Sequence, residues 1–221
     1  MELAGKFFTT PWLVAIGIVL LPAWWLALRW ANWRRLAQRE QLHVFLGASV
    51  FLMLLWTLRT EIQPGFSWHL SGMVSLTLMF GWSLALIGGS LTLVGITLAG
   101  LNDWGGYLPS VLIEVLMPAT LTQVVLGLVR AYLPKHYFIY VFINAFLAAG
   151  LISLLMALAT TGLLLAVGAY SLQRLQDTYL LFLPLMFFPE GVLNGWTMSV
   201  LVGFRPDWVG SFRDEEYLDG K

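Results

Sequence analysis

The chain has 221 residues, of which 59% are hydrophobic and 11% charged, and its mean hydropathy is +0.79. Ordinary soluble domains carry about 25% charged residues, so this chain has too little polar surface to cover a soluble core. Its formal net charge is zero and it has no cysteine, which excludes disulfides, thiolate metal sites, iron–sulfur clusters and covalently attached haem. We therefore expect a membrane protein surrounded by lipid, with no nucleic-acid partner.

The apolar segments predict a single all-α domain over residues 1–221, a polytopic bundle of about seven transmembrane helices. A helix of roughly 20 residues crosses a hydrocarbon core of about 30 Å. Arginines follow the first apolar run where a signal peptide would have a cleavage site, so we expect this run to be retained. The expected spans are 11–30, 42–59, 69–80, 82–100, 108–129, 137–168 and 178–204.

Two of these segments do not have the length of an ordinary span. The segment 69–80 is short, is separated from the next by Gly81–Trp82, and is expected not to reach fully across. The apolar run Tyr137–Tyr170 would be close to about 50 Å long as one helix. It must therefore tilt, protrude or break, and the polar stretch Thr160–Gly162 is its weakest point.

The basic residues predict the orientation. All 12 of them except Lys6, Arg59 and Arg174 fall on cytoplasmic segments if the amino terminus lies outside. An odd number of spans then places the carboxyl terminus in the cytoplasm. Tryptophans at the ends of apolar runs fit an interfacial aromatic belt. These patterns predict a multi-pass protein of the cell inner (plasma) membrane.

Histidines within such an apolar chain are the first candidates for function. His69 follows the loop that starts at Pro64–Gly65, and the small residues Ser71–Gly72 after it allow another segment to approach. A neutral imidazole is the commonest protein ligand for first-row transition metals. The alternative is a histidine hydrogen-bonded at a helix end. We expect His43 and His136 to be interfacial.

Three carboxylates are the next candidates. Asp103 lies in a glycine-rich outer turn and is either a turn residue or a ligand. Glu114 and Glu190 fall inside predicted spans, where a carboxylate must be protonated, paired or face a polar cavity. Asn144 and Asn194 can supply such a partner across helices.

The segment Pro64–Gly72 reads Pro-Gly-Phe-Ser-Trp-His-Leu-Ser-Gly. It resembles the Gly-Thr-Ser-Gly-His-Leu-x-Gly segment of the CbiM/NikM family, the cobalt- and nickel-binding membrane subunits of energy-coupling-factor ABC importers. The glycine-rich turn Asn102–Gly106 and the pair Glu190–Gly191 in the last span follow in the family's order. The resemblance implies that His69 binds a divalent transition metal, carried as substrate. It also implies ATPase and coupling membrane subunits as partners.

The same resemblance implies that the other metal ligands come from the amino terminus. In the family, the initiator amine and a histidine directly after it enter the outward-facing pocket. Here Met1 is followed by Glu2, which has no imidazole. Either the site binds another metal, with Glu2, Asp103 or water beside His69, or the scaffold has acquired a different task.

We therefore predict the substrate-binding membrane subunit of an energy-coupled transition-metal uptake transporter, and not an enzyme. One alternative is a non-transport membrane subunit or a metal- or haem-handling accessory protein within a larger complex. A membrane enzyme is a third reading. Against it, the sequence has no nucleotide-binding loop, no Gly-x-Ser-x-Gly elbow and no His-Glu-x-x-His motif.

Overall fold

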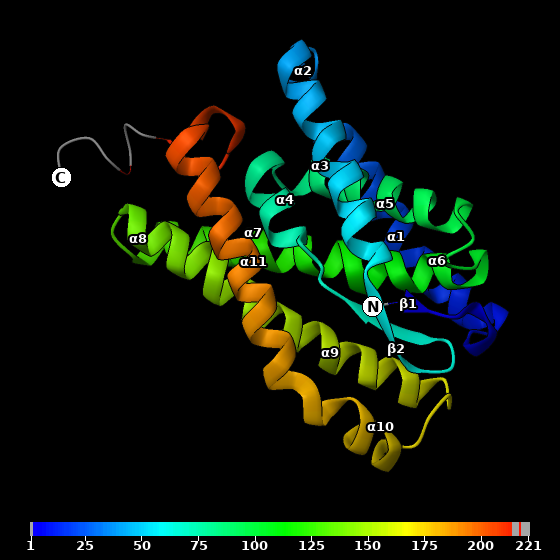
Figure 1. Cartoon of the computed structure of the whole chain (residues 1–221). Coiled ribbons are helices and arrows are strands. Elements are labelled where there is room, and N and C mark those ends of the chain that lie inside the picture. Colours follow the sequence, from blue (N-terminus) through cyan, green and yellow to red (C-terminus); the bar gives the residue numbers. More distant parts are fainter. Residues whose placement is uncertain (1, 214–216, 218–221) are drawn as a thin grey trace.

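The computed structural model describes residues 2–213 and Tyr217. It is a bundle of tilted helices with a small antiparallel sheet at one end (Figure 1). Within these residues, five helical segments are long and apolar enough to cross a membrane: Thr10–Trp30, Arg39–Thr57, Trp104–Tyr132, Tyr137–Ala166 and Leu172–Phe204.

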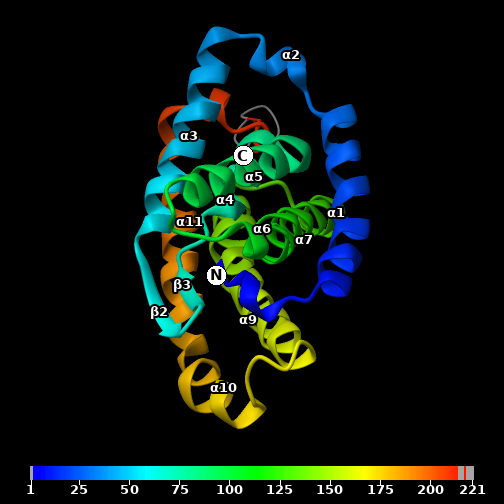
Figure 2. The same cartoon turned by 90° about the vertical axis from the view of Figure 1, so that its right-hand side faces the viewer.

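The first two spanning helices flank the bundle on opposite sides (Figure 2). They are α1 (Thr10–Trp30) and α3 (Arg39–Thr57), joined by the short α2 (Trp33–Leu36). Both pack against α5 (Trp82–Leu98). Pro11 stands at the start of α1, where its missing N–H costs no hydrogen bond.

The third spanning segment contains a π-helical stretch. Pro118 has no N–H to donate to the carbonyl of Glu114, and its ring crowds that carbonyl, which favours a locally wider helix. Glu114 consequently lies on an irregular part of the segment. In chain order the parts are α6 (Trp104–Ser110), the π-helical η2 (Val111–Leu116) and α7 (Met117–Tyr132).

The long apolar run that follows forms one continuous helical segment, so it does not break at Thr160–Gly162. The Thr161 hydroxyl donates to the carbonyl of Ala157 at 2.9 Å, which satisfies it inside the helix. The helix ends before Gly168, whose φ of +70° is a left-handed conformation. The parts are α8 (Tyr137–Ile139), the π-helical η3 (Tyr140–Leu147) and α9 (Ala148–Ala166).

The last predicted span is divided in the structure. A long straight helix begins at Leu183 and is preceded by two short helical turns. Pro184 in its first turn suits a helix start. The parts are α10 (Leu172–Thr178), η4 (Leu180–Phe182), α11 (Leu183–Phe204) and the terminal η5 (Pro206–Trp208).

The three-stranded sheet was absent from the all-α prediction. Its order is β1-β3-β2, and both pairings are antiparallel. Gly65, with φ +88°, turns the hairpin between β2 and β3. The strands are β1 (Glu2–Leu3), β2 (Arg59–Gln63) and β3 (Phe66–His69), and the turn η1 (Gly5–Phe7) follows β1.

The short helix α4 (Met73–Phe80) lies in the centre, and all of its residues are buried. The predicted span 69–80 is therefore wrong at its start. His69 belongs to β3, and Gly72, with φ +65°, separates the strand from the helix. At about 12 Å, α4 cannot cross a membrane. Of about seven predicted spans, five have spanning length, α5 has 17 residues and α4 has eight.

Candidate metal centre

A buried pair of side chains joins the hairpin to the third spanning segment. His69 ends β3 and Glu114 lies in η2, with 2.9 Å between the Nε2 and Oε2 atoms. His69 is 6% exposed and Glu114 is 1% exposed. A carboxylate so far from water requires a proton, a cation or hydrogen-bond donors close by. The pair therefore marks a place where positive charge is favoured.

The other ring nitrogen of His69 determines what Nε2 can do. Nδ1 lies 3.0 Å from the carbonyl oxygen of Leu70. Because a carbonyl only accepts, Nδ1 carries a proton. In the neutral ring the lone pair of Nε2 then points toward the Glu114 carboxyl group. The contact between Nε2 and Oε2 is favourable when a proton, or a metal ion in its place, lies between them.

Burial also favours the neutral form of this histidine. His69 lies in the hairpin, outside the five spanning segments, and burial lowers the pKa of its imidazole below the ordinary 6.5, although the hydrogen bond to Glu114 opposes this shift. Arg59 is the cross-strand partner of His69. Burial lowers the pKa of Arg59, and the charge of Glu114 raises it in part. A neutral imidazole is the form that binds metal ions.

Trp56, near the end of α3, holds the loop after His69. Its indole Nε1 donates to the carbonyl of Ser71 at 2.8 Å, and its ring centroid lies 5.1 Å from that of His69. The side chain is 2% exposed, so it also excludes water from one side of the imidazole. Trp56 was not among the residues predicted to form the site. The available signal was its position, one turn before the predicted loop.

Glu190 of α11 holds the same loop from the opposite side. Its Oε2 accepts from the Ser71 N–H at 2.8 Å, and its Oε1 accepts from the Gly72 N–H at 2.9 Å. The first N–H groups of a helix have no partner within the helix, and they favour a negative charge. The carboxylate thus caps the start of α4 and fixes the backbone two residues after His69.

Asn194, one turn further along α11, extends this cap. Its Oδ1 accepts from both the N–H and the hydroxyl of Ser75, at 2.9 and 2.8 Å. Its Nδ2 donates to Oε1 of Glu190 at 2.9 Å, within the same helix and not across helices. Asn144 is 1% exposed, and its amide has no hydrogen-bond partner among the described residues. Glu190 and Asn194 are therefore hydrogen-bonded to each other, and Asn144 does not take part in this contact.

The amino-terminal strand lies directly beside the histidine strand. Glu2 pairs through its backbone with Ser67, and Leu3 pairs with Phe66. Leu3 is fully buried, which anchors the strand in the protein. Met1 lies outside the described residues. The strand β1 therefore leads the amino-terminal end of the described chain to within two residues of His69 along β3.

Asp103 supports this strand from the outer turn. Its carboxylate accepts from the Gly5 N–H at 2.9 Å and from the Gly106 N–H at 2.8 Å, which also caps α6. A Cβ atom at Gly106 would collide with the Leu3 carbonyl, so glycine is required there. Within the described residues, no three His, Cys, Asp or Glu side chains form a group that could hold a metal ion. Asp103 is thus not brought together with the pair of His69 and Glu114.

The opposite end of α4 is held by positively charged and backbone donors. The Arg35 guanidinium donates to the Met79 carbonyl at 2.6 Å. The Gly210 N–H donates to the same oxygen at 2.8 Å, and the Ser211 hydroxyl donates to the Leu78 carbonyl at 2.7 Å. Burial lowers the pKa of Arg35. Both ends of this buried helix are therefore capped by distant parts of the chain.

The five apolar helices of spanning length and the capped inner helix define a helical membrane protein, with the buried His69–Glu114 contact where its hairpin meets the third spanning segment. The family model for the "cobalt uptake substrate-specific transmembrane region", CbiM, matches residues 3–208. The chain therefore belongs to the CbiM family, as the His69 segment predicted.

Two crystal structures show the same fold. One is described as a truncated transition metal transporter, with a TM-score of 0.76 and 16% identity, covering 92% of this chain and 99% of the other. The second, a transition metal transporter, has a TM-score of 0.74 and 15% identity, covering 92% and 93%. No curated protein sequence matches this chain. Family and fold support a membrane component for metal uptake.

Proposed function

We propose that this protein is the substrate-binding membrane subunit of an energy-coupled uptake transporter for a divalent transition-metal ion. The observation that carries the proposal is the buried contact between Nε2 of His69 and the Glu114 carboxylate. A nitrogen and an oxygen ligand suit cobalt or nickel. By resemblance, the amine of Met1 supplies a further ligand, and Glu2 takes the place of the family's histidine, since β1 pairs with the strand that carries His69. Asp103 acts indirectly, because it anchors the turn that follows β1.

In this proposal the incoming metal ion lies between Nε2 of His69 and the Glu114 carboxylate and competes with protons for both atoms. Ligand atoms must be deprotonated before they bind a metal, so binding releases protons and weakens in acid. The lowered pKa of His69 keeps its ring neutral at pH 7. We therefore expect metal affinity to persist below pH 6.5 and to be lost only at more acidic pH. Calorimetric titrations in buffers of different ionisation enthalpy would measure the proton release.

The proposed orientation places the hairpin outside the cell. The end that carries Arg35, Arg130 and Arg205 then faces the cytoplasm, as the distribution of basic residues favours. ATPase and coupling membrane subunits, implied by the family, would bind at this basic end. The metal would enter from the hairpin side of an inner plasma membrane.

Metal analysis of purified protein with an unmodified amino terminus tests the proposal. The protein is incubated with Co²⁺ or Ni²⁺, freed of excess metal and analysed for metal per chain. We expect bound metal in the wild type and at least about a tenfold loss of affinity in His69→Ala and Glu114→Gln, since even indirect ligand partners contribute 10–100-fold.

The matched control is His136→Ala, which removes another histidine far along the chain and should leave metal binding unchanged. Full metal content in His69→Ala would refute the proposed site. Equal loss in His136→Ala would show that the assay reports adventitious surface binding.

A further inference from the structure

The hydroxyl of Ser110 lies in the interior of the protein without a hydrogen bond. Ser110 is the last residue of α6 and is 0% exposed. Among the described residues, it carries the one fully buried serine or threonine hydroxyl that has no hydrogen-bond partner. Burying a hydroxyl without a hydrogen bond costs free energy. A group of this kind in a native protein therefore points to a bound water molecule or ion.

Two comparable buried hydroxyl groups of the spanning segments are satisfied within their own helix. The Thr122 hydroxyl donates to the carbonyl of Pro118 at 2.7 Å, and the Ser153 hydroxyl donates to that of Gly150 at 2.8 Å. A bond to a carbonyl one turn back is the usual arrangement for a serine or threonine inside a helix. The Ser110 hydroxyl makes no such bond with any described residue, so it is available to a group outside α6.

Ser110 stands between the amino-terminal strand and the proposed metal site. Gly106, one turn before it, lies so close to the Leu3 carbonyl of β1 that a Cβ atom would collide there. Glu114, one turn after it, contacts His69 of β3. Residues four apart lie on nearly the same face of a helix. The Ser110 side chain therefore faces the region between these two contacts, where α6 packs against β1 (Figure 1).

The side chain of Glu114 leans toward Ser110. Side chains on a helix point back toward its start and cover the preceding turn, which here begins at Ser110. One carboxylate oxygen, Oε2, makes the contact with His69. No direct hydrogen bond joins the Ser110 hydroxyl to this carboxylate. Where two polar groups face each other without direct contact, a water molecule can bridge them.

A water molecule bound to the metal ion fits both the hydroxyl and the chemistry of the site. First-row divalent ions in proteins take roughly four to six ligand atoms, and water occupies the positions that protein atoms leave open. A metal ion makes its bound water more acidic and hence a stronger hydrogen-bond donor. A serine oxygen accepts such a bond and still has its own O–H to donate. An apolar side chain at position 110 would leave this water without that acceptor.

We propose that Ser110 is a positioning residue for the metal ion, and that its hydroxyl accepts a hydrogen bond from a water molecule bound to that ion. This inference rests on the proposed function and deepens it, because it adds a water ligand to the site. It also predicts effects of opposite sign. Ser110→Ala removes a hydroxyl that has no partner in the protein itself, so stability without metal should stay equal or rise while metal binding weakens.

Calorimetric titration of the purified protein with Co²⁺, together with unfolding temperatures measured without metal, tests the proposal. We expect Ser110→Ala to lose about tenfold in Co²⁺ affinity, the lower end of the effect of indirect ligand partners. Its unfolding temperature should equal or exceed that of the wild type. Ser153→Ala is the matched control, because that buried hydroxyl is satisfied inside its own helix, and Co²⁺ affinity should not change. The visible absorption spectrum of bound Co²⁺, which reports its coordination, should change in Ser110→Ala and not in the control.

A second pair of variants, Ser110→Thr and Ser110→Val, separates the hydroxyl from the shape of the side chain, since the two new side chains differ mainly in the hydroxyl. Ser110→Thr should bind Co²⁺ more tightly than Ser110→Val. Wild-type affinity in Ser110→Ala, with a loss in Glu114→Gln, would overturn this inference and leave the proposed function standing. A loss of affinity accompanied by a lower unfolding temperature would also overturn it, because Ser110 would then be structural. No Co²⁺ binding by the wild type would refute the proposed function, and the inference with it.

Discussion

The two ends of α4 are capped by opposite chemistry. Its start receives acceptors, the side chains of Glu190 and Asn194 from α11. Its end receives donors, from Arg35 and from the segment after α11. A helix of eight residues leaves up to half of its N–H and C=O groups without partners inside the helix, because the first four N–H and the last four C=O groups have none. In apolar surroundings these groups must be satisfied by the rest of the protein.

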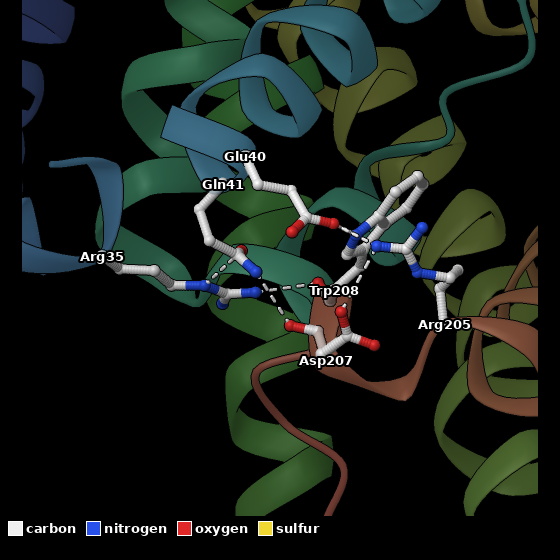
Figure 3. Close-up of polar contacts among 6 residues, drawn as sticks. All are labelled: Arg35, Glu40, Gln41, Arg205, Asp207 and Trp208. Atoms are coloured by element: carbon white, nitrogen blue, oxygen red, sulfur yellow. Dashed lines mark hydrogen bonds and ion pairs between the residues drawn. The ribbon is translucent and has the colours of Figure 1, made fainter. Parts of the chain in front are cut away.

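The two caps of α4 differ in the part of the protein that lies next to them. The acceptors at the start fix the loop that carries His69, so they bear on the proposed metal site. At the end, Arg35 also donates to the Trp208 carbonyl at 2.9 Å, which connects this cap with the basic end of the bundle (Figure 3). Comparable hydrogen bonding therefore serves two purposes, and substitutions at the two ends should have separable effects on metal binding and on stability.

The largest effect is expected at the start. Glu190→Ala leaves the N–H groups of Ser71 and Gly72 buried without their acceptor, at about 1–3 kcal/mol each. We expect a loss of about 2–5 kcal/mol in unfolding free energy, measured by denaturant titration in detergent, and a loss of metal binding. Glu190→Gln retains one acceptor oxygen, so its unfolding free energy should lie between those of the wild type and Glu190→Ala. Unchanged stability in Glu190→Ala would contradict the capping role.

At the other end, Arg35→Ala should destabilise the protein without affecting the metal. It removes charged donors from the Met79 and Trp208 carbonyls, which is worth about 1.5–3 kcal/mol. Metal affinity should change less than about twofold, because the caps at the start remain. The control is Arg34→Ala, which removes a neighbouring exposed arginine and should change neither the unfolding free energy nor the metal affinity. A strong loss of metal in Arg35→Ala would show that the two ends are coupled.

Trp56→Phe should affect the metal site more than the fold. The ring remains beside His69, but the Ser71 carbonyl loses its donor, a cost of about 1–2 kcal/mol. Because the loop position controls the imidazole, we expect about a tenfold loss in metal affinity by calorimetry. Trp30→Phe, at a site 66% exposed, should change neither quantity. If both substitutions changed metal affinity equally, Trp56 would have no specific role in positioning the metal site.

The smallest effect is expected for Glu40→Ala. This carboxylate pairs with Arg205 at the surface, and the two side chains are 58% and 44% exposed. Exposed ion pairs contribute about 0–1 kcal/mol and weaken with salt. At both low and high ionic strength, the unfolding free energies of the wild type and the variant should differ by less than this amount. A loss comparable to that of Glu190→Ala would remove the contrast between buried and exposed carboxylates.

Local patterns in the sequence were enough to select His69 as a candidate, because the motif around it is contiguous. Its partner Glu114 was recognisable as a buried carboxylate, but the pairing joins residues 45 positions apart and depends on the π-helical stretch. Hydropathy carries no information about such a distant contact.

The hairpin was missed for a different reason. Residues 59–69 were treated as a loop leading into a helix, although Pro64–Gly65 between two polar–apolar stretches is a hairpin signal. For Glu190, we expected a side chain such as that of Asn144 or Asn194 as the hydrogen-bond partner. The partners are mainly the N–H groups of Ser71 and Gly72, which every residue type possesses and no sequence pattern reveals.

The capping of α4 also determines when the protein can finish folding. Glu190 is 119 residues from Ser71, and Ser211 is 133 residues from Leu78. During synthesis α4 leaves the ribosome long before the groups that complete its hydrogen bonds exist. Until α11 is inserted, its start has no acceptor and cannot rest stably in lipid. The centre of the molecule is thus assembled last, and a chain truncated before Glu190 should be recognised by membrane proteases as unfinished.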